Sequence, residues 1–242
     1  TGISAETMSV TRTTQTNAGS NYTSTASCSS VSGGQAKCAN YALTGATKTF
    51  TISQATPTLT LSATSGKVNK GSTVTFTEKG SVAGSFSNVS GTTSVATVSP
   101  ASYSSIAANT AKTVTITGVS NGTSKITVTF TPTDTTNYNS TTATYTVTGY
   151  LVATTGSCAT SLTYNGSSRT LVGGGTGVTY SNNTRTNAGS QTVTITANSG
   201  YRFSDGTTSK TLSCSISKAT PTLTQSATSG SATTGNTTSY TI

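Results

Sequence analysis

Apolar residues and threonines alternate along most of this chain. Between residues 55 and 150, apolar side chains fall on one face of each run and Thr on the other, at Leu59/Leu61/Ala63, Val74/Phe76, Val114/Ile116, Ile126/Val128/Phe130 and Ala143/Tyr145/Val147. A period of two predicts β-strands with one buried face. Clusters of Gly, Ser, Asn and Pro at 65–67, 84–88, 120–123 and 131–134 predict the turns between them. About seven short strands in such a span are typical of an immunoglobulin-like β-sandwich.

Residues 151–218 show the same period in fewer strands, at Leu162/Tyr164, Val193/Ile195/Ala197 and Leu212/Cys214/Ile216. Cys158 shares the parity of Leu162, so Cys158 and Cys214 are expected to point into the core and to join the first and last strands. The Gly, Pro and Thr content opposes helix throughout the chain. The sequence therefore predicts an all-β protein.

Two segments of the chain recur. ISQATPTLTLSATSG at 52–66 returns as ISKATPTLTQSATSG at 216–230, an offset of 164 residues, and TNAGS at 16–20 returns at 186–190, an offset of 170. Two matches in the same order and at nearly the same spacing predict repeated domains, with an insertion or deletion inside the unit.

The repeats divide the chain into four predicted parts. Residues 1–54 are the C-terminal part of a disulfide-containing β domain (type A), and 55–150 are a complete immunoglobulin-like β-sandwich (type B). Residues 151–218 are a complete type A domain, and 219–242 open a second type B domain. We expect a tandem array of small β-sandwich domains alternating with smaller β-rich domains. Either the chain is a window on a longer array, or neighbouring chains complete its end domains by strand exchange.

The composition fits a β array with thin cores. Apolar residues make up 31% of the chain and charged residues 7%, so the chain has fewer apolar residues than most globular domains but lacks the high charge of disordered ones. Threonine, with 62 residues, fills the gap, and its β-branched side chain suits a half-exposed pleated surface. No apolar run reaches the ~18–20 residues that a membrane-spanning helix needs, so no membrane insertion is expected within this segment.

The net charge of +9 comes from 13 basic residues against four acidic ones, Glu6, Glu78, Asp134 and Asp205. The basic residues are scattered, which disfavours nucleic-acid binding, although weak attraction to anionic surface polymers is compatible with them. The chain has no His and its carboxylates are spread over several predicted domains. Neither a Ser-His-Asp site nor a pair of catalytic carboxylates is therefore expected, and we expect no enzyme activity and no cofactor.

The four cysteines are expected to form two disulfides, Cys28 with Cys38 and Cys158 with Cys214. An even number of cysteines in a Ser- and Thr-rich β chain indicates an oxidising, extracellular compartment. A zinc site is the alternative, but the chain has no His and no Cys-x-x-Cys spacing.

Loops hold the remaining candidate residues. Tyr201 and Arg202, beside Gly-rich segments, form a candidate ligand rim. The segment GGGTG at 173–177 superficially resembles a phosphate-binding loop, but no Lys-Ser/Thr tail or helix follows it, so an inter-strand turn is expected. Asp134 and Tyr138 have the spacing of the tyrosine corner of immunoglobulin-like sandwiches, a structural role that we prefer to a binding one.

A Lys–Asn or Lys–Asp isopeptide cross-link is a further hypothesis for the type B domain. It needs a buried Lys, an Asn or Asp, and a carboxylic acid that moves the proton. The domain holds Glu78, several Asn and the candidate lysines Lys67, Lys70, Lys112 and Lys125. The preferred interpretation is that these lysines are solvated and lie on edge strands and turns.

Parts of the chain resemble known bacterial repeats. Residues 55–66 (ATPTLTLSATSG), 94–100 (SVATVSP) and 114–132 (VTITGVSNGTSKITVTFTP) resemble bacterial immunoglobulin-like (Big-type) surface domains. The type A unit resembles MBG/YDG-type repeats of large secreted surface proteins, as does the stretch FTPTDTTNYNSTTATYTVT; the carrying segments in type A are LTYNGSS, TNAGSQTVTITA and ISKA. Asn165 stands where that family often has Asp, and the cysteines are not part of its pattern.

The resemblance implies a role as a stalk or repeat of adhesins, large surface proteins or fibres. We therefore expect a structural spacer, with neighbouring repeats or identical chains as partners. One alternative is an adhesin module that binds a host glycan or protein, and another is a filament subunit that assembles by strand exchange. The alternating repeats, the scarce charge and the absence of Trp favour the spacer.

Overall fold

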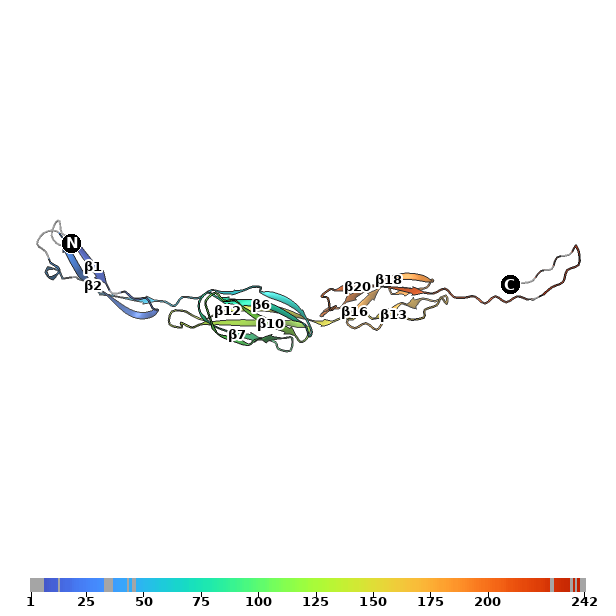
Figure 1. Ribbon diagram of the computed structural model, residues 1–242, viewed down its shortest axis with the longest axis horizontal. Helices are drawn as coiled ribbons and strands as arrows, with labels where there is room; N and C mark the ends of the chain where they lie inside the picture. Colours follow the sequence, from blue (N-terminus) through green and yellow to red (C-terminus); the bar gives the residue numbers. More distant parts are fainter. Residues whose placement is uncertain are drawn as a thin grey trace. The chain divides into compact units, whose positions relative to one another are not determined.

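The computed structural model describes residues 7–12 (backbone only), 14–32, 37–42, 44, 47–226, 229–235, 237 and 239; Glu6 lies outside them. The chain forms two compact units, Thr1–Tyr150 and Leu151–Ile242, each built from strands (Figure 1). Apart from a 3-10 turn at Cys38–Asn40, every regular element of the described residues is a β-strand, which confirms the all-β prediction. None of these residues forms a helix long and apolar enough to cross a membrane.

The first unit opens with a three-stranded antiparallel sheet in the order β1-β2-β3, formed by Thr7–Arg12, Gly19–Ser32 and Thr47–Ile52. Alternate side chains of β2 are half-buried, as the period of two requires. Among them Tyr22 packs against Phe50 of β3, with ring centroids 5.8 Å apart. Among the side chains described in this sheet, those of β2 and β3, none is fully buried.

A β-sandwich of two facing sheets completes the first unit. One sheet has the antiparallel order β4-β6-β10-β8, and the other contains β12-β11-β7-β9, with β5 added in parallel beside β12. Phe76 and Tyr145 stack across the interface with ring centroids 4.6 Å apart. The strands are β4 Leu59–Leu61, β5 Ser65–Asn69, β6 Thr73–Gly80, β7 Gly84–Ser90, β8 Ala96–Ser99, β9 Ser102–Ile106, β10 Lys112–Gly118, β11 Gly122–Pro132 and β12 Thr141–Val152.

The sandwich has nine strands where the alternation predicts about seven. The predicted turn at 84–88 is wrong, because this segment is the central strand β7, paired on both sides by β11 and β9. A Cβ atom on Gly84 would lie 2.7 Å from two atoms of the Phe130 ring. The glycine is thus required by close packing rather than by a turn.

The predicted turn at 65–67 is also wrong, because these residues lie in strand β5. Gly66 faces the ring of Tyr145 so closely that a Cβ atom would overlap the phenol group. Pairing and packing here override the low strand propensity of Gly and Ser.

The second unit contains a three-stranded antiparallel sheet and several two-residue strands. The sheet has the order β16-β18-β20, and the short strands pair as β13-β15 and β14-β17. Leu151 and Val152, at the end of β12, pair in parallel with β19. The strands are β13 Ser157–Cys158, β14 Arg169–Thr170, β15 Val172–Gly173, β16 Val178–Ser181, β17 Thr184–Arg185, β18 Gly189–Ala197, β19 Tyr201–Arg202 and β20 Ser209–Ile216.

Two small clusters of buried side chains form the core of this unit. The first contains Leu162, Leu171, Val172, Val193, Cys214 and Ile216, and the second contains Ala153, Ile195 and Phe203. On β18 the buried Val193 and Ile195 alternate with Thr192, Thr194 and Thr196, so the hydroxyl groups lie on the opposite face of the strand.

Candidate functional site

Both cysteine pairs form disulfides in the structure. Cys28 on β2 is joined to Cys38, across a sequence separation of 10 residues. Cys158 on β13 is joined to Cys214 on β20, across 56 residues. The second disulfide lies in the core of its unit, packed with Leu171 and Val193, and ties its first short strand to its last strand.

Tyr201 and Arg202 lie on β19, where they pair with Leu151 and Val152. The ring of Tyr201 covers Gly177, which has a φ of +67°, and a Cβ atom at that position would overlap the ring. Arg202 donates a hydrogen bond from Nη1 to the carbonyl oxygen of Gly206, at 3.2 Å. Both side chains therefore have packing roles, and their role as a ligand rim stays a prediction.

The Gly-rich segment at 173–177 is held by hydrogen bonds. The N–H of Gly175 donates to the phenol oxygen of Tyr180 at 2.9 Å, and Tyr180 donates in turn to the carbonyl oxygen of Thr155 at 3.1 Å. The N–H of Thr176 donates to Oγ1 of Thr154 at 2.9 Å. These bonds fix the segment as an ordered turn.

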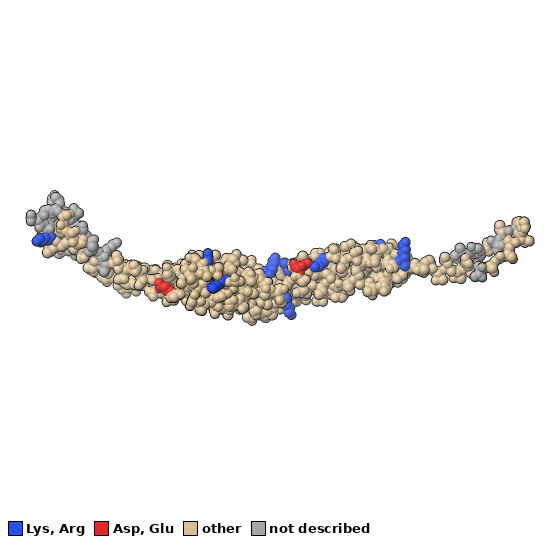
Figure 2. Space-filling view, in the orientation of Figure 1, with Lys and Arg blue, Asp and Glu red and all other residues tan. Residues whose placement is uncertain are grey.

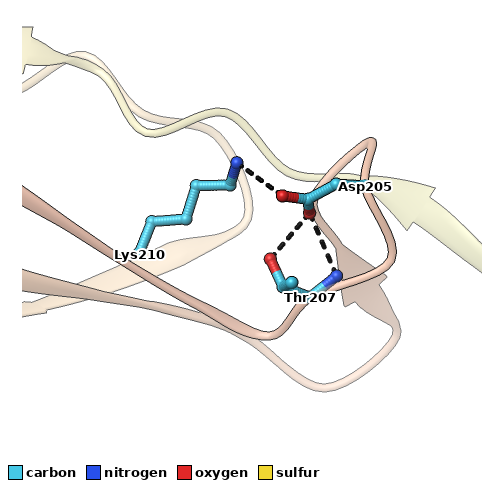
Figure 3. A network of polar contacts seen from close by, with 3 residues as sticks. All are labelled: Asp205, Thr207 and Lys210. Atoms are coloured by element: carbon cyan, nitrogen blue, oxygen red, sulfur yellow. Dashed lines mark hydrogen bonds and ion pairs between the residues drawn. The ribbon is translucent and has the colours of Figure 1, made fainter.

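Asp205 organises the turn that follows β19 (Figure 3). One carboxylate oxygen accepts hydrogen bonds from the N–H and the hydroxyl of Thr207, at 3.1 and 2.7 Å, and the other forms an ion pair with Lys210 at 2.8 Å. Lys210 and Thr207 hold the pKa of Asp205 well below its usual range. On the face shown in Figure 2, charged side chains are few, and uncharged residues cover most of the surface.

Asp134 organises the loop between β11 and β12. Its Oδ1 accepts hydrogen bonds from the N–H groups of Thr136 and Asn137, both at 3.1 Å, and its Oδ2 accepts one from the Asn137 side chain at 2.8 Å. The side-chain bond from Asn137, followed by these backbone bonds, lowers the pKa of Asp134. Tyr138 donates its N–H to the Asp134 carbonyl oxygen at 3.2 Å. A phenol bond back to the chain, which a tyrosine corner needs, stays a prediction.

The Asp134 loop also binds the segments that flank the N-terminal sheet. Oδ1 of Asn137 accepts a hydrogen bond from the N–H of Ala18 at 2.7 Å, and its Nδ2 donates to Oδ1 of Asn17 at 3.2 Å. The side chain of Gln54 donates to the carbonyl oxygens of Thr135 and Thr136, at 2.7 and 3.2 Å. We call this set of contacts the Asn137 junction.

Backbone pairing completes the Asn137 junction. The N–H of Ala55 donates to the carbonyl oxygen of Asn137 at 2.8 Å, and the N–H of Asn139 donates to the carbonyl oxygen of Ala55 at 2.9 Å. The junction therefore joins two sequence-distant segments, near residues 17 and 54, to one loop of the sandwich.

Both segments that meet this loop belong to the repeated motifs. Asn17 and Ala18 lie in TNAGS, and Gln54 and Ala55 lie in ISQATPT. The motifs occupy matching strand positions in both copies, because Gly19 pairs with Ile52 and Gly189 pairs with Ile216. The second copy thus places TNAGS and ISKATPT side by side in the same register.

A buried polar pair lies within the core of the sandwich. Glu78 on β6 has no exposed surface and Asn88 on β7 is 2% exposed. The Asn88 amide donates from Nδ2 to Oε1 of Glu78 at 3.2 Å, and to the carbonyl oxygen of Pro100 at 3.3 Å. Glu78 Oε2 and Asn88 Oδ1 are both buried and have no hydrogen-bond partner among the described residues.

Burial raises the pKa of the Glu78 carboxyl to about 7, against the hydrogen bond from Asn88, which lowers it. A protonated carboxyl carries an O–H that can donate a hydrogen bond, and Oδ1 of the neighbouring Asn88 is an acceptor without a partner among the described residues. A bond between them would reduce the free-energy cost of burying both groups.

Lys112 stands directly opposite Glu78 in the register between β10 and β6. Its side chain is half-buried, and its Nζ lies 5.6 Å from the centroid of the Tyr103 ring. The sequence analysis names Lys112 and Glu78 as candidates for a cross-link but does not single out Asn88 among the asparagines. The contact between Glu78 and Asn88 depends on which strands face each other across the sandwich. The alternation of residues along one strand does not contain that information.

No family model matches the chain, and no curated protein matches it. Similar solved structures include domains 4 and 5 of the S-layer protein SbsC, with 21% identity over 53% of this chain and 65% of that chain and a TM-score of 0.30. Another is the Salmonella enterica SafA pilin in complex with the SafB chaperone, with 9% identity over 62% of this chain and 72% of that chain and a TM-score of 0.37. A third is the class 5 fimbriae chaperone CfaA, with 11% identity over 65% of this chain and 99% of that chain and a TM-score of 0.33.

The chain spans less than two thirds of the SbsC structures that it matches, with 26% and 36% of the longer ones covered. All of these TM-scores are below 0.5. The resemblance to Big-type and MBG/YDG-type repeats stays a prediction.

Proposed function

We propose that this chain is a structural spacer, a repeat region of a large extracellular surface or fibre protein. The observation that carries the proposal is the Asn137 junction, in which the motifs TNAGS and ISQATPT hold one loop of the sandwich. Because both motifs recur in register in the second unit, the same kind of junction would follow residue 218. A spacer needs such a repeatable connection between successive domains.

Two further features support this role. The two disulfides suit an extracellular, oxidising compartment. The outer faces of the strands carry threonines, as on β18, so the domains present a hydroxylated and weakly charged exterior. Such a surface disfavours strong non-specific association.

The test is binding of the full 242-residue chain to a panel of glycans, mucins and matrix proteins, together with its oligomeric state and its unfolding under force. We expect no saturable binding, a monomer at all concentrations, and separate unfolding events for the domains. Saturable binding that is lost in Arg202→Ala but kept in Lys125→Ala, a change at an exposed surface lysine, would support the adhesin alternative. Polymerisation that rises with concentration would support the filament.

A further inference from the structure

Three residues with complementary chemistry lie on neighbouring strands of the sandwich: Glu78 and Asn88, whose carboxyl and carboxamide groups are hydrogen-bonded, and Lys112, which stands opposite Glu78 in the register. The first two are hydrogen-bonded to each other across the facing sheets, because β6 belongs to one sheet and β7 to the other. The pair is enclosed by the sandwich core, in which Phe76 and Phe86 each lie two residues away along the same strands.

Lys112 has the position needed to reach this pair. Residues directly opposite in an antiparallel sheet lie on the same face, with Cβ atoms about 4.5–5.5 Å apart, so Lys112 projects on the face that carries Glu78. Its Nζ lies over Tyr103, whose strand β9 is the neighbour of β7, and Tyr103 is paired with Phe86, two residues before Asn88. The proposal requires that the flexible lysine side chain turn from the Tyr103 ring toward the Asn88 amide.

We propose that Lys112 and Asn88 form an intramolecular isopeptide bond between the two sheets, with Glu78 as the group that transfers the proton. Glu78 as carboxylate takes a proton from the Lys112 ammonium. The neutral Nζ attacks Cγ of Asn88, a C–N bond forms, and the Cγ–Nδ2 bond breaks with release of ammonia. The amide nitrogen keeps one hydrogen, and Glu78 ends the step as the neutral acid, so atoms and charge balance without an oxidant or co-reactant.

The surroundings favour each part of this reaction. The neutral amine is the nucleophile in this reaction, and the buried carboxylate of Glu78 is the group that takes its proton. A carboxylic acid with a pKa near neutrality can both accept and return a proton. The Oε2–H of the neutral acid can donate a hydrogen bond to Oδ1 of Asn88 and so polarise the Asn88 carbonyl group. Both of these oxygens are without a hydrogen-bond partner among the described residues.

The bond would join β10 of one sheet to β7 of the other, so the sandwich could not separate into its two sheets under load. The inference does not rest on the spacer role, since the cross-link depends only on the core of the sandwich.

The test is the intact mass of the 242-residue chain with both disulfides formed. We expect a mass lower by one molecule of ammonia than that of the sequence with its two disulfides formed, and a branched peptide after digestion that joins the segments containing Asn88 and Lys112. Lys112→Arg and Glu78→Gln are expected to restore the full mass. Lys79→Arg, at an exposed lysine next to Glu78, is the matched control and is expected to keep the loss. Circular dichroism shows that each variant is folded.

A folded wild-type chain with the full sequence mass overturns the proposal. Loss of ammonia that persists in Lys112→Arg also overturns it, because cyclisation of an Asn to a succinimide gives the same loss without a lysine. If the loss of ammonia persists in Glu78→Gln but not in Lys112→Arg, Glu78 does not transfer the proton, and that part of the proposal is overturned.

Discussion

The carboxamide of Asn137 accepts a 2.7 Å hydrogen bond from the N–H of Ala18, a residue 119 positions earlier in the chain. The same side chain donates to Asp134, which holds it in place. Asp134, which the sequence suggested as part of a corner, therefore positions a residue that connects the N-terminal sheet to the sandwich. This connection is the structural basis of the spacer proposal.

Replacement of Asn137 by Ala is expected to loosen the Asn137 junction. The change removes the acceptor of the Ala18 N–H and lowers the free energy of unfolding of the first unit by about 1 kcal/mol, the usual net value of such a hydrogen bond. Faster amide hydrogen exchange at Ala18 is the direct readout. Asn139→Ala is the control, since Asn139 is exposed and takes part through its backbone. Unchanged exchange at Ala18 would show that the bond does not hold the junction.

Replacement of Cys158 and Cys214 by Ser is expected to destabilise the second unit by about 4 kcal/mol, the loop-entropy value for a cross-link of this span. The disulfide closes 56 residues and lies in a small core. Denaturant unfolding followed by hydrogen exchange in residues 151–218 measures the change. The paired change of Cys28 and Cys38 is the control, and its effect is expected only in the first unit. Equal effects of both changes on residues 151–218 would contradict the prediction.

The alternation of Thr with apolar residues was sufficient to predict the class of fold and most of the sandwich strands. It failed at 65–67 and 84–88, where Gly66 and Gly84 serve close contacts with Tyr145 and Phe130. A glycine required by packing has the same appearance in a sequence as a glycine required by a turn. Only the facing strand distinguishes the two, and the facing strand is not visible in local sequence.

The buried pair of Glu78 and Asn88 was beyond local sequence reasoning for a related reason. Glu78 occupies an inward position between Phe76 and Gly80 on β6, where alternation predicts an apolar residue. The sequence analysis named Glu78 only as a possible member of a cross-link, and its partner Asn88 lies on the opposite sheet. The Asn137 junction was missed in the same way, since its side-chain hydrogen bonds to the N-terminal segments join residues 81 to 120 positions apart.

Replacement of Gly177 by Ala is expected to destabilise the second unit more than replacement of Gly174. Both glycines have positive φ, +67° and +81°, so both changes carry a backbone penalty of about 1 kcal/mol. Gly174 faces open space, whereas a Cβ atom on Gly177 would displace the Tyr201 ring, which adds roughly 1–3 kcal/mol. Thermal unfolding of Gly177→Ala and Gly174→Ala measures the difference between their stabilities. Equal stabilities would show that Tyr201 moves freely and would strengthen its role as a ligand rim.

The raised pKa of Glu78 is expected to make the sandwich less stable as the pH rises from about 4.5 to about 7. In this interval the folded state keeps the proton on Glu78 while the unfolded state, with an ordinary pKa of 4.5, has released it. Folding then binds a proton, so stability is fully present below pH 4.5 and is lost as pH passes through 7. Over this pH interval the free energy of unfolding is expected to fall by roughly 3 kcal/mol. Asp134 and Asp205, whose pKa values are lowered, lose their contributions only as the pH falls below 4.

Urea unfolding of the sandwich at pH 4.5, 6 and 8 measures this dependence, with Glu78→Gln as the control. A glutamine at this position cannot ionise, but it can donate to Oδ1 and accept from Nδ2 of Asn88, as the protonated acid does. We therefore expect the variant to lack the decrease in stability between pH 4.5 and 7 that the wild type shows. Lys112 faces Glu78 from β10. An equal decrease in both proteins would show that Glu78 is ionised in the folded core at acidic pH, and that the buried pair is not an acid bonded to an amide.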